Sequence, residues 1–365
     1  YWENRFKQQK FDITIIGAGF TGLFSALFYL KNKPKAKIAI FDKQFPPPAA
    51  STRNAGFACF GSPTELLDDL SKENPENVLS RVEMRVQGLS LLRSTIGENK
   101  LNWTSFGGQE VFLDKQKKFY ESTCERLDEL NSFLHPIFNE DVYSISSADN
   151  YFQKAIHIKN EAQIDPFMAW QSLYSMVSSY SNVFFAAENV HHISGGEIAQ
   201  IETDRGSYIS DKTLVCTNGF SNKLPLNLNV VPARAQVLIT KPINDLPIQG
   251  SFHMDEGYIY FRNVENRLLL GGARNIDFEQ EQSDEFELNS KIQHRLEKVL
   301  SEFILPNHSF DIDYRWSGIM AFGRKGEKEF ILDELEPNLF VATRLGGMGV
   351  ALAPALAQKI VKKMG

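Results

Sequence analysis

Residues 11–23 read Phe11-Asp-Ile-Thr-Ile-Ile-Gly-Ala-Gly-Phe-Thr-Gly-Leu23. The apolar residues before the first glycine predict a buried strand. Gly17, Gly19 and Gly22 then have the spacing G-x-G-x-x-G. In this pattern the first glycine allows a tight turn, the second lets the backbone approach a pyrophosphate, and the third lets the next helix pack on the sheet. That helix, expected over 23–31, would point its free N–H groups at the phosphates.

A second apolar strand is expected at 37–41, and it ends in Asp42. The acid lies about 20 residues after Gly22, where a carboxylate accepts hydrogen bonds from ribose hydroxyls. Glycine-rich turns also occur for purely structural reasons, but here strand, glycines, helix, second strand and acid come in order. The stretch therefore predicts a dinucleotide site. The acid favours an unphosphorylated ribose, that of FAD or NAD rather than NADP.

The length and the order of elements predict two domains. At 365 residues the chain exceeds what one hydrophobic core usually serves. Alternating strands and helices begin and end the chain, and antiparallel strands are expected between them, at 234–241, 257–262 and 267–272. The fold class is therefore α/β, with a Rossmann-like cofactor domain built from separated segments and an antiparallel-sheet α+β second domain. We assign residues 1–75, 145–230 and 315–365 to the first domain, and residues 76–144 and 231–314 to the second.

Charge and cysteine usage limit the partners and the location. The net charge of −6 argues against a nucleic acid or an anionic membrane as partner. No run of 18 apolar residues occurs, so no membrane span is expected. Cys59, Cys124 and Cys216 are scattered and odd in number, which argues against disulfides or a zinc site and favours the reducing cytoplasm. No metal site is expected. The first residues lack the apolar core of a signal peptide, and the start at Tyr1 suggests trimming.

Other segments predict elements or loops near a ligand. Residues 101–113 resemble a strand with a turn at Gly107-Gly108, and helices are expected over 116–134, 165–180 and 284–303. Residues 51–56, Ser-Thr-Arg-Asn-Ala-Gly, suit a phosphate or a flavin edge, or form a polar surface loop. Thr217-Asn218-Gly219 follows a strand, at the end where ligands bind in doubly wound sheets.

Taken together, these motifs resemble the D-amino-acid-oxidase-like family of FAD-dependent amine oxidoreductases, which includes glycine oxidase, monomeric sarcosine oxidase and γ-glutamylputrescine oxidase. The resemblance covers nearly the whole chain and is specific for family and cofactor, not for substrate. Further motifs that carry it are Tyr260-Phe-Arg262, Arg267-Leu-Leu-Leu-Gly-Gly272, Arg315-Trp-Ser-Gly-Ile-Met320 and Gly346-Gly-Met-Gly-Val350.

The resemblance implies a place for each part of FAD. Asp42 would hold the adenosine ribose, the first glycines the pyrophosphate, and residues 51–56 would run towards the isoalloxazine. Val190 would meet the adenine, and residues 344–350 would lead into a last helix whose N-terminus stabilises reduced flavin. The residues expected to hold the cofactor are Gly17, Gly19, Phe20, Thr21, Gly22, Asp42, Lys43, Ser51, Thr52, Arg53, Asn54, Ala55, Gly56, Val190, Thr217, Asn218, Gly219, Gly318, Arg344, Gly346, Gly347, Met348, Gly349 and Val350.

The chain also departs from the family pattern. Met320 stands where glycine and D-amino-acid oxidases have the arginine that grips the substrate carboxylate. Met348 and Leu269 stand where sarcosine oxidase has two lysines, the second of which activates oxygen. Its flavin-linking cysteine has no counterpart after Trp316, so the FAD is expected to be non-covalent. Arg344 replaces a small residue of the family.

We therefore expect an enzyme that oxidises the C–N bond of a primary or secondary amine, amino-acid-like or polyamine-like, by hydride transfer to flavin N5. Oxygen would reoxidise the flavin. The alternatives are a dehydrogenase that uses another acceptor, and a catalytically silent flavin-bearing assembly or binding protein. Substrate-side candidates are Arg344, Arg262, Tyr258 and Tyr260. Arg262 could equally be a strand-surface charge, and both tyrosines could equally pack in the core.

Overall fold

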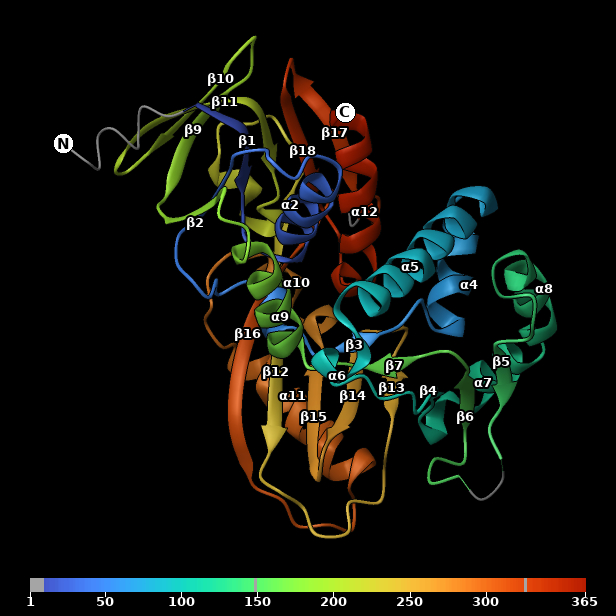
Figure 1. Cartoon of the computed structure of the whole chain (residues 1–365). Helices are drawn as coiled ribbons and strands as arrows, with labels where there is room; N and C mark the ends of the chain where they lie inside the picture. Colours follow the sequence, from blue (N-terminus) through green and yellow to red (C-terminus); the bar gives the residue numbers. More distant parts are fainter. Residues whose placement is uncertain (1–9, 148–149, 325–326) are drawn as a thin grey trace.

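The computed structural model describes residues 10–147, 150–324 and 327–365 (Figure 1). The expectations about the N-terminal residues, the missing signal peptide and the trimming at Tyr1, fall on residues 1–9, outside the described part. Among the described residues, no helix combines the length and the apolar character needed to cross a bilayer.

The first sheet is the one that the glycine-rich stretch predicts. Its neighbouring strands follow the order β17-β18-β11-β1-β2-β8, and the five strands from β18 to β8 run parallel. The edge strand β17 and the ribbon β9-β10 are antiparallel additions. The strands of this sheet are β1 (Lys10–Ile16), β2 (Ile38–Asp42), β8 (Val183–Ala187), β9 (Val190–Ser194), β10 (Ala199–Thr203), β11 (Gly206–Val215), β17 (Ile331–Glu336) and β18 (Leu339–Thr343).

Three apolar helices cover one face of this sheet, and the ribbon β9-β10 packs on the other face. The helices are α2 (Phe20–Asn32), α9 (Pro166–Ser178) and α12 (Gly349–Met364). Helices α2 and α12 pack side by side, as Figure 1 shows. Leu23 and Leu356 of these helices are fully buried in the same core as Ile13 and Ile15 of β1. The sheet therefore has the apolar strands that a parallel sheet covered by helices requires.

The second sheet lies below the first in Figure 1 and has the order β16-β12-β15-β14-β13-β4-β6-β5. All its neighbouring pairs are antiparallel except β13 with β4, which run parallel. A core that includes Leu238, Phe261 and Leu296 fills the space between the sheet and helix α11. The elements are β4 (Gly108–Val111), β5 (Tyr143–Ile145), β6 (Ala155–Ile158), β12 (Val231–Thr240), β13 (Ser251–Met254), β14 (Ile259–Val264), β15 (Arg267–Gly272), β16 (Ile312–Phe322) and α11 (Ser290–Val299).

Several elements differ in extent from the sequence expectation. The single helix expected over 116–134 is wrong, because α7 ends at Cys124 and α8 begins at Leu127. The strand expected over 101–113 is restricted to β4. The helix expected from 284 begins at Ser290, where the Asn289 side chain accepts from the Lys291 N–H, and ends in a π turn at Leu300–Ile304. The remaining elements are α3 (Ala50–Arg53), β3 (Phe57–Ala58), α4 (Pro63–Lys72), α5 (Pro75–Ile96), α6 (Glu98–Leu101), α7 (Lys117–Cys124), α8 (Leu127–Phe138), β7 (Ala162–Gln163) and α10 (Phe278–Glu281).

Strand pairing divides the chain differently from the expected domain boundaries. Strand β6 and most of β16 fall in segments assigned to the cofactor domain, 145–230 and 315–365, yet both pair within the second sheet. Helix α5, assigned to the second domain, packs against α12. These long-range pairings are not encoded in the local pattern of either strand, which explains the difference. The boundaries themselves stay a prediction.

Candidate functional site

A cavity of about 1650 Å³ extends between the two sheets. Its lining comes from the β1–α2 turn, the end of β2, residues 47–59, and the start of α12. Strands β12, β14 and β16 of the second sheet supply the facing side. Typical small-molecule pockets measure roughly 300–1,000 Å³. This cavity is larger, so it has room for a dinucleotide together with a second, smaller molecule.

The glycines of the β1–α2 turn form a cradle that side chains would fill. Gly17 has a positive φ of 106°, and a Cβ there would lie 2.7 Å from the Cys216 carbonyl oxygen. A Cβ on Gly22 would overlap the Gly17 carbonyl oxygen, so α2 can approach the strand only with glycine at that position. Gly19, Phe20 and Thr21 line the cavity, so the start of α2 faces it, as an anionic pyrophosphate requires.

Asp42 and Ser51 fix the loops around this cradle. The Asp42 carboxylate accepts a hydrogen bond from the Ala18 N–H at 2.8 Å, and Ser51 Oγ accepts one from the Phe20 N–H at 2.8 Å. Burial raises the pKa of Asp42, while the bond from Ala18 acts against that shift. Both side chains line the cavity. The remaining lone pairs of Asp42 can accept from ribose hydroxyls, so the residues present fit an adenine dinucleotide.

Most of the residues expected to hold the cofactor line this one cavity. The exceptions are Gly22, Thr52 and Arg344. Gly22 serves helix packing, as described above. Thr52 Oγ1 donates to the Pro47 carbonyl oxygen at 2.7 Å and so stabilises its own loop. The expected residues that line the cavity are Gly17, Gly19, Phe20, Thr21, Asp42, Lys43, Ser51, Arg53, Asn54, Ala55, Gly56, Val190, Thr217, Asn218, Gly219, Gly318, Gly346, Gly347, Met348, Gly349 and Val350.

Both tyrosines named as substrate-side candidates line the cavity. The Tyr260 ring packs edge-on against Phe57, with 5.6 Å between the centroids, and Tyr258 packs edge-on against Phe278 at 5.8 Å. Burial raises the pKa of Tyr260 to about 12. Its hydroxyl therefore keeps its proton at neutral pH and can donate a hydrogen bond.

Arg262, a third candidate, does not line the cavity. Its guanidinium donates to Gln163 Oε1 at 3.1 Å and to the Ile164 carbonyl oxygen at 3.0 Å, and its side chain is buried. Burial lowers its pKa to about 10. The residue is therefore not a surface charge, and its expected contact with substrate stays a prediction. It holds the segment before α9 against β14.

Arg344, the fourth candidate, does not line the cavity either. It has a positive φ of 63°, and this left-handed backbone turns its side chain towards the segment after β16. The guanidinium donates to the Asn229 carbonyl oxygen at 3.0 Å, to the Glu327 carboxylate at 3.3 Å and to the Glu329 carbonyl oxygen. The structure thus gives Arg344 other partners, and its expected contacts with substrate and cofactor stay a prediction. Its role is to fix the chain just before the Gly346–Gly349 loop.

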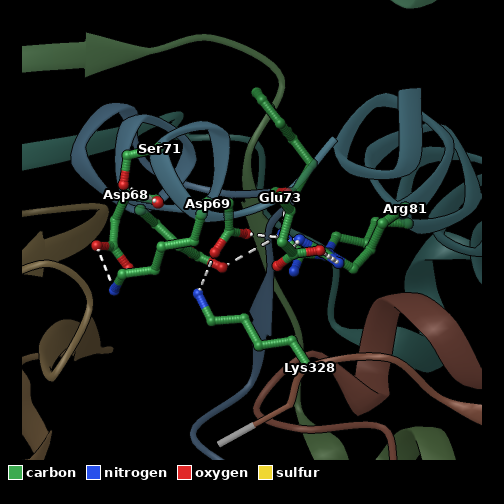
Figure 2. A network of polar contacts seen from close by, with 10 residues as sticks. Asp68, Asp69, Ser71, Glu73, Arg81 and Lys328 are labelled. Carbon is green, nitrogen blue, oxygen red and sulfur yellow. Dashed lines mark hydrogen bonds and ion pairs between the residues drawn. The ribbon is translucent and has the colours of Figure 1, made fainter. Parts of the chain in front are cut away.

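A charged network forms another part of the cavity lining (Figure 2). Arg81 of α5 donates to Asp69 at 2.9 Å and to Glu73 at 2.7 Å. Lys328 donates to the second oxygen of Asp69, so the network joins α4 and α5 to the chain after β16. Asp69 and Arg81 are both buried. Nothing in the sequence spacing indicated this network, because Lys328 lies far from α4 along the chain.

The sequence analysis also missed Arg274 and His253, which both line the cavity. Arg274 directly follows Gly271-Gly272-Ala273 at the end of β15. That position, after paired glycines at a strand end, is the signal that could have found it. His253 lies on β13, and its Nε2 is 2.9 Å from Glu161 Oε2. A histidine in the middle of an apolar strand gave no such signal.

Among the described residues, one group has the geometry to hold a metal ion: Cys59, Glu161 and His253, with candidate ligand atoms within 4.8 Å of one another. The hydrogen bond between His253 and Glu161 accounts for two of the three side chains without an ion. Burial raises the pKa of the Cys59 thiol well above its ordinary value, so the thiol stays protonated. We assign no metal to this group.

Comparison with solved structures shows the same fold. L-proline dehydrogenase from P. horikoshii is 15% identical, with a TM-score of 0.72, over 98% of this chain and 93% of that chain. Glycine oxidase from Geobacillus kaustophilus is 16% identical, with a TM-score of 0.73, over 98% and 95%. L-α-glycerophosphate oxidase from Mycoplasma pneumoniae, solved with FAD bound, is 14% identical, with a TM-score of 0.75, over 97% and 94%. A search of curated proteins finds no match.

The family comparison covers almost the whole chain. A family model described as FAD dependent oxidoreductase, DAO, matches residues 12–363. The resemblance inferred from the motifs is thereby confirmed, and FAD is the cofactor. The family is a class of enzymes, so the alternative of a silent flavin-bearing binding protein is not retained. The chain belongs to the DAO family of FAD dependent oxidoreductases.

Proposed function

We propose that this protein oxidises the C–N bond of a primary or secondary amine and that oxygen reoxidises its FAD. One observation carries the proposal: a single cavity is lined both by the dinucleotide cradle and by Tyr258 and Tyr260 of the second sheet. A substrate beside these tyrosines would share one enclosed space with the cofactor. Glycine and L-proline, the amines named for two of the similar structures, support this substrate class.

The same cavity supports a division of the FAD contacts. Asp42 would accept from the adenosine ribose, the start of α2 would face the pyrophosphate, and the start of α12 would face the flavin ring. Two cysteines, Cys59 and Cys216, line the cavity, and burial raises the pKa of both thiols. Neither is activated as a nucleophile, which supports a non-covalent cofactor.

The residues of the second sheet would position the amine and exclude water. When bound, FAD supplies the acceptor for the hydride that leaves the carbon next to nitrogen. Tyr260 keeps its proton at neutral pH, so it would act as a hydrogen-bond donor and not as a base. The rings of Phe57 and Phe278 pack against the two tyrosines and limit their movement. The main contribution of the second sheet would therefore be to position the reacting carbon.

A dehydrogenase with another electron acceptor is the second candidate. Leu269, which stands where sarcosine oxidase has its oxygen-activating lysine, is buried against Ala55 and Val237 in an apolar cluster. Leu269 therefore provides no cation that could activate oxygen. The peroxide formed per turnover in air distinguishes the two candidates, because an oxidase yields one peroxide per amine. The cytoplasmic location and the absence of a nucleic-acid partner stay predictions from the sequence.

The test is anaerobic mixing of the purified flavoprotein with a panel of amines and amino acids. At least one compound should bleach the flavin absorbance, and air should restore it. Acid precipitation of the same sample should leave the flavin in the supernatant. If no compound in a broad panel reduces the flavin, the proposed reaction is wrong, and flavin in the pellet would contradict the non-covalent cofactor.

A further inference from the structure

His253 is a titratable side chain of the cavity that the proposed reaction has not yet used. It lies on β13 directly opposite Tyr260 of β14, and residues that face each other across two strands point to the same side of a sheet. Both rings pack edge-on against Phe57, with centroid distances of 5.5 Å for His253 and 5.6 Å for Tyr260. His253 therefore lies in the same row as the tyrosine that is expected to meet the substrate.

The ring of Tyr260 leans away from His253. A Cβ on Gly271 of β15 would lie 2.5 Å from this ring and 2.9 Å from its hydroxyl oxygen. Strand β15 pairs with β14 on the side opposite to β13, so the tyrosine ring lies over the far neighbour. The absence of a side chain at Gly271 thus lets Tyr260 turn away from the imidazole.

The two ring nitrogens of His253 have different surroundings. Nε2 lies 2.9 Å from Glu161 Oε2, and a carboxylate only accepts hydrogen bonds, so Nε2 carries the hydrogen. In the neutral imidazole Nδ1 then holds a lone pair. Nδ1 has no hydrogen-bond partner in the described part of the chain, yet it is not one of the enclosed atoms without a partner, so it is open to the cavity. The pair thus presents a proton-accepting atom to the space that a substrate would occupy.

The charged groups around His253 favour a proton on its ring. Burial lowers the pKa of His253, but three acids outweigh burial and raise this pKa above 6.5. They are Glu161 after β6, Glu110 directly beside His253 on β4, and Glu65 on α4. Arg85 of α5, a cation on this side, is paired with Glu65 at 3.4 Å. The acids outnumber the cation in this group, and their charge also attracts a protonated amine.

An amine substrate needs a proton acceptor of this kind. An alkylammonium keeps its proton at neutral pH, since the pKa of a lysine amine is about 10. The hydride leaves the carbon while the nitrogen lone pair forms the C=N bond, so the ammonium must first lose a proton. Tyr260 and Cys59 do not accept it, because both keep their own protons at neutral pH. His253 has both the lone pair and the position.

We propose that His253, held by Glu161, accepts the proton of the substrate ammonium at Nδ1. This inference rests on the proposed amine oxidation. The N–H bond of the ammonium breaks, its electron pair stays on the nitrogen, and a new N–H bond forms at Nδ1. The Glu161 carboxylate stabilises the imidazolium, which later releases the proton to water. No electrons are exchanged in this step. Glu161 is a positioning residue, because it sets the tautomer and the strength of the base.

The experiment measures the rate of flavin reduction by the fastest amine of the panel, without oxygen, between about pH 7 and about pH 10. Wild type is compared with His253→Gln, both loaded with FAD. The wild-type rate should rise with pH through the pKa of His253 and then level off. His253→Gln should be roughly hundredfold slower at neutral pH. It should approach wild type near pH ~10, where the amine is neutral in solution.

Two further variants separate a chemical role from a structural one. Glu161→Gln removes the charge that raises the pKa of His253, so the rise in rate should shift to lower pH. His157→Gln is the matched control, because His157 lies on β6 of the same sheet but does not line the cavity, and it should keep the wild-type profile. A loss of rate in His253→Gln that is equal at every pH would overturn the proposal. An unshifted profile of Glu161→Gln would overturn it too.

Nitrogen NMR of protein with labelled histidines tests the geometry without turnover. Above its pKa, His253 should carry a hydrogen on Nε2 and none on Nδ1, and this signal should be absent from His253→Gln. A hydrogen on Nδ1 in a wild type that oxidises amines would overturn this step alone. If wild type oxidises no amine, the proposed function fails and this step fails with it, so the two failures are distinguishable.

Discussion

His253 is a buried histidine that is paired with one carboxylate, that of Glu161. It lies on β13 with 6% of its surface exposed, and Glu161, its partner, is 1% exposed. Burial alone would lower the pKa of His253, but the Glu161 carboxylate raises it above the ordinary value of 6.5. The other oxygen of Glu161 has no hydrogen-bond partner among the described residues. The pair is therefore held mainly by the charge of the imidazolium.

This pair predicts a pH-dependent stability. A raised folded pKa means that the contribution of His253 is complete below about 6.5 and is lost as the pH rises through the folded value. Wild type should thus lose stability in urea as the pH rises above about 6.5. His253→Gln should be less stable at low pH, by about 3–5 kcal/mol, and have a flatter profile. His192→Gln, at an exposed position, should keep the wild-type slope. If the stability of His253→Gln changed with pH as steeply as that of wild type, His253 would not be the group that causes the pH dependence.

At the scale of elements, close packing between α5 and α12 fixes the relative position of these two helices beside the cavity. Val78, Val82, Leu89 and Leu92 form an apolar stripe on α5, and all four are buried. The helix divides this stripe between two cores. Gly88 marks the contact with α12, since a Cβ there would overlap the Ala351 carbonyl oxygen. Ala351 lies in the first turn of α12, next to the loop that faces the cavity.

Gly88→Ala tests this contact with a predicted sign. In an open helix, alanine for glycine stabilises by about 0.5–1 kcal/mol. Here the added methyl group must separate two backbones, so we expect a loss of about 1–3 kcal/mol. Ser90→Ala, at an exposed position of the same helix, should change the free energy of unfolding by less than about 0.5 kcal/mol. Urea unfolding measures both. A Gly88→Ala protein as stable as wild type would mean that the helices lie further apart.

For the whole molecule, the network in Figure 2 joins parts of the chain that are distant in sequence. Arg81 and Asp69 belong to the helices after the first strands, and Lys328 belongs to the segment between the second sheet and β17. The same segment is bound by Arg344 through Glu327 and Glu329. The network therefore connects the N-terminal and C-terminal parts at the cavity.

Arg81→Met should destabilise the protein by about 3–5 kcal/mol, because it leaves the buried Asp69 with Lys328 as its only cation. Arg126→Met removes an exposed ion pair with Glu129 and should cost less than about 1 kcal/mol. Urea unfolding at neutral pH provides the comparison. Equal losses in the two variants would show that burial adds nothing to the Arg81 network.

The sequence alone determined the features that depend on neighbouring residues. The order of strand, glycines, helix and acid at 11–42 predicted the first sheet and the dinucleotide site. The helix expected from residue 165 is confirmed, since α9 begins at Pro166. The strands expected at 257–262 and 267–272 are confirmed as the antiparallel pair β14–β15. Backbone sterics, hydrogen-bond caps and alternation of apolar residues act over a few positions, so a local pattern contains them.

Only the tertiary structure decided which charged side chains reach the cavity. Arg262 and Arg344 were chosen from motifs, yet both bind carbonyl oxygens that lie about 100 residues away in sequence. Arg274, which lines the cavity, was overlooked, because the sequence analysis looked for an arginine at Met320 on another strand. The partners of a side chain depend on which strands become neighbours and on the direction of each turn. Those contacts form between distant segments, and no local pattern specifies them.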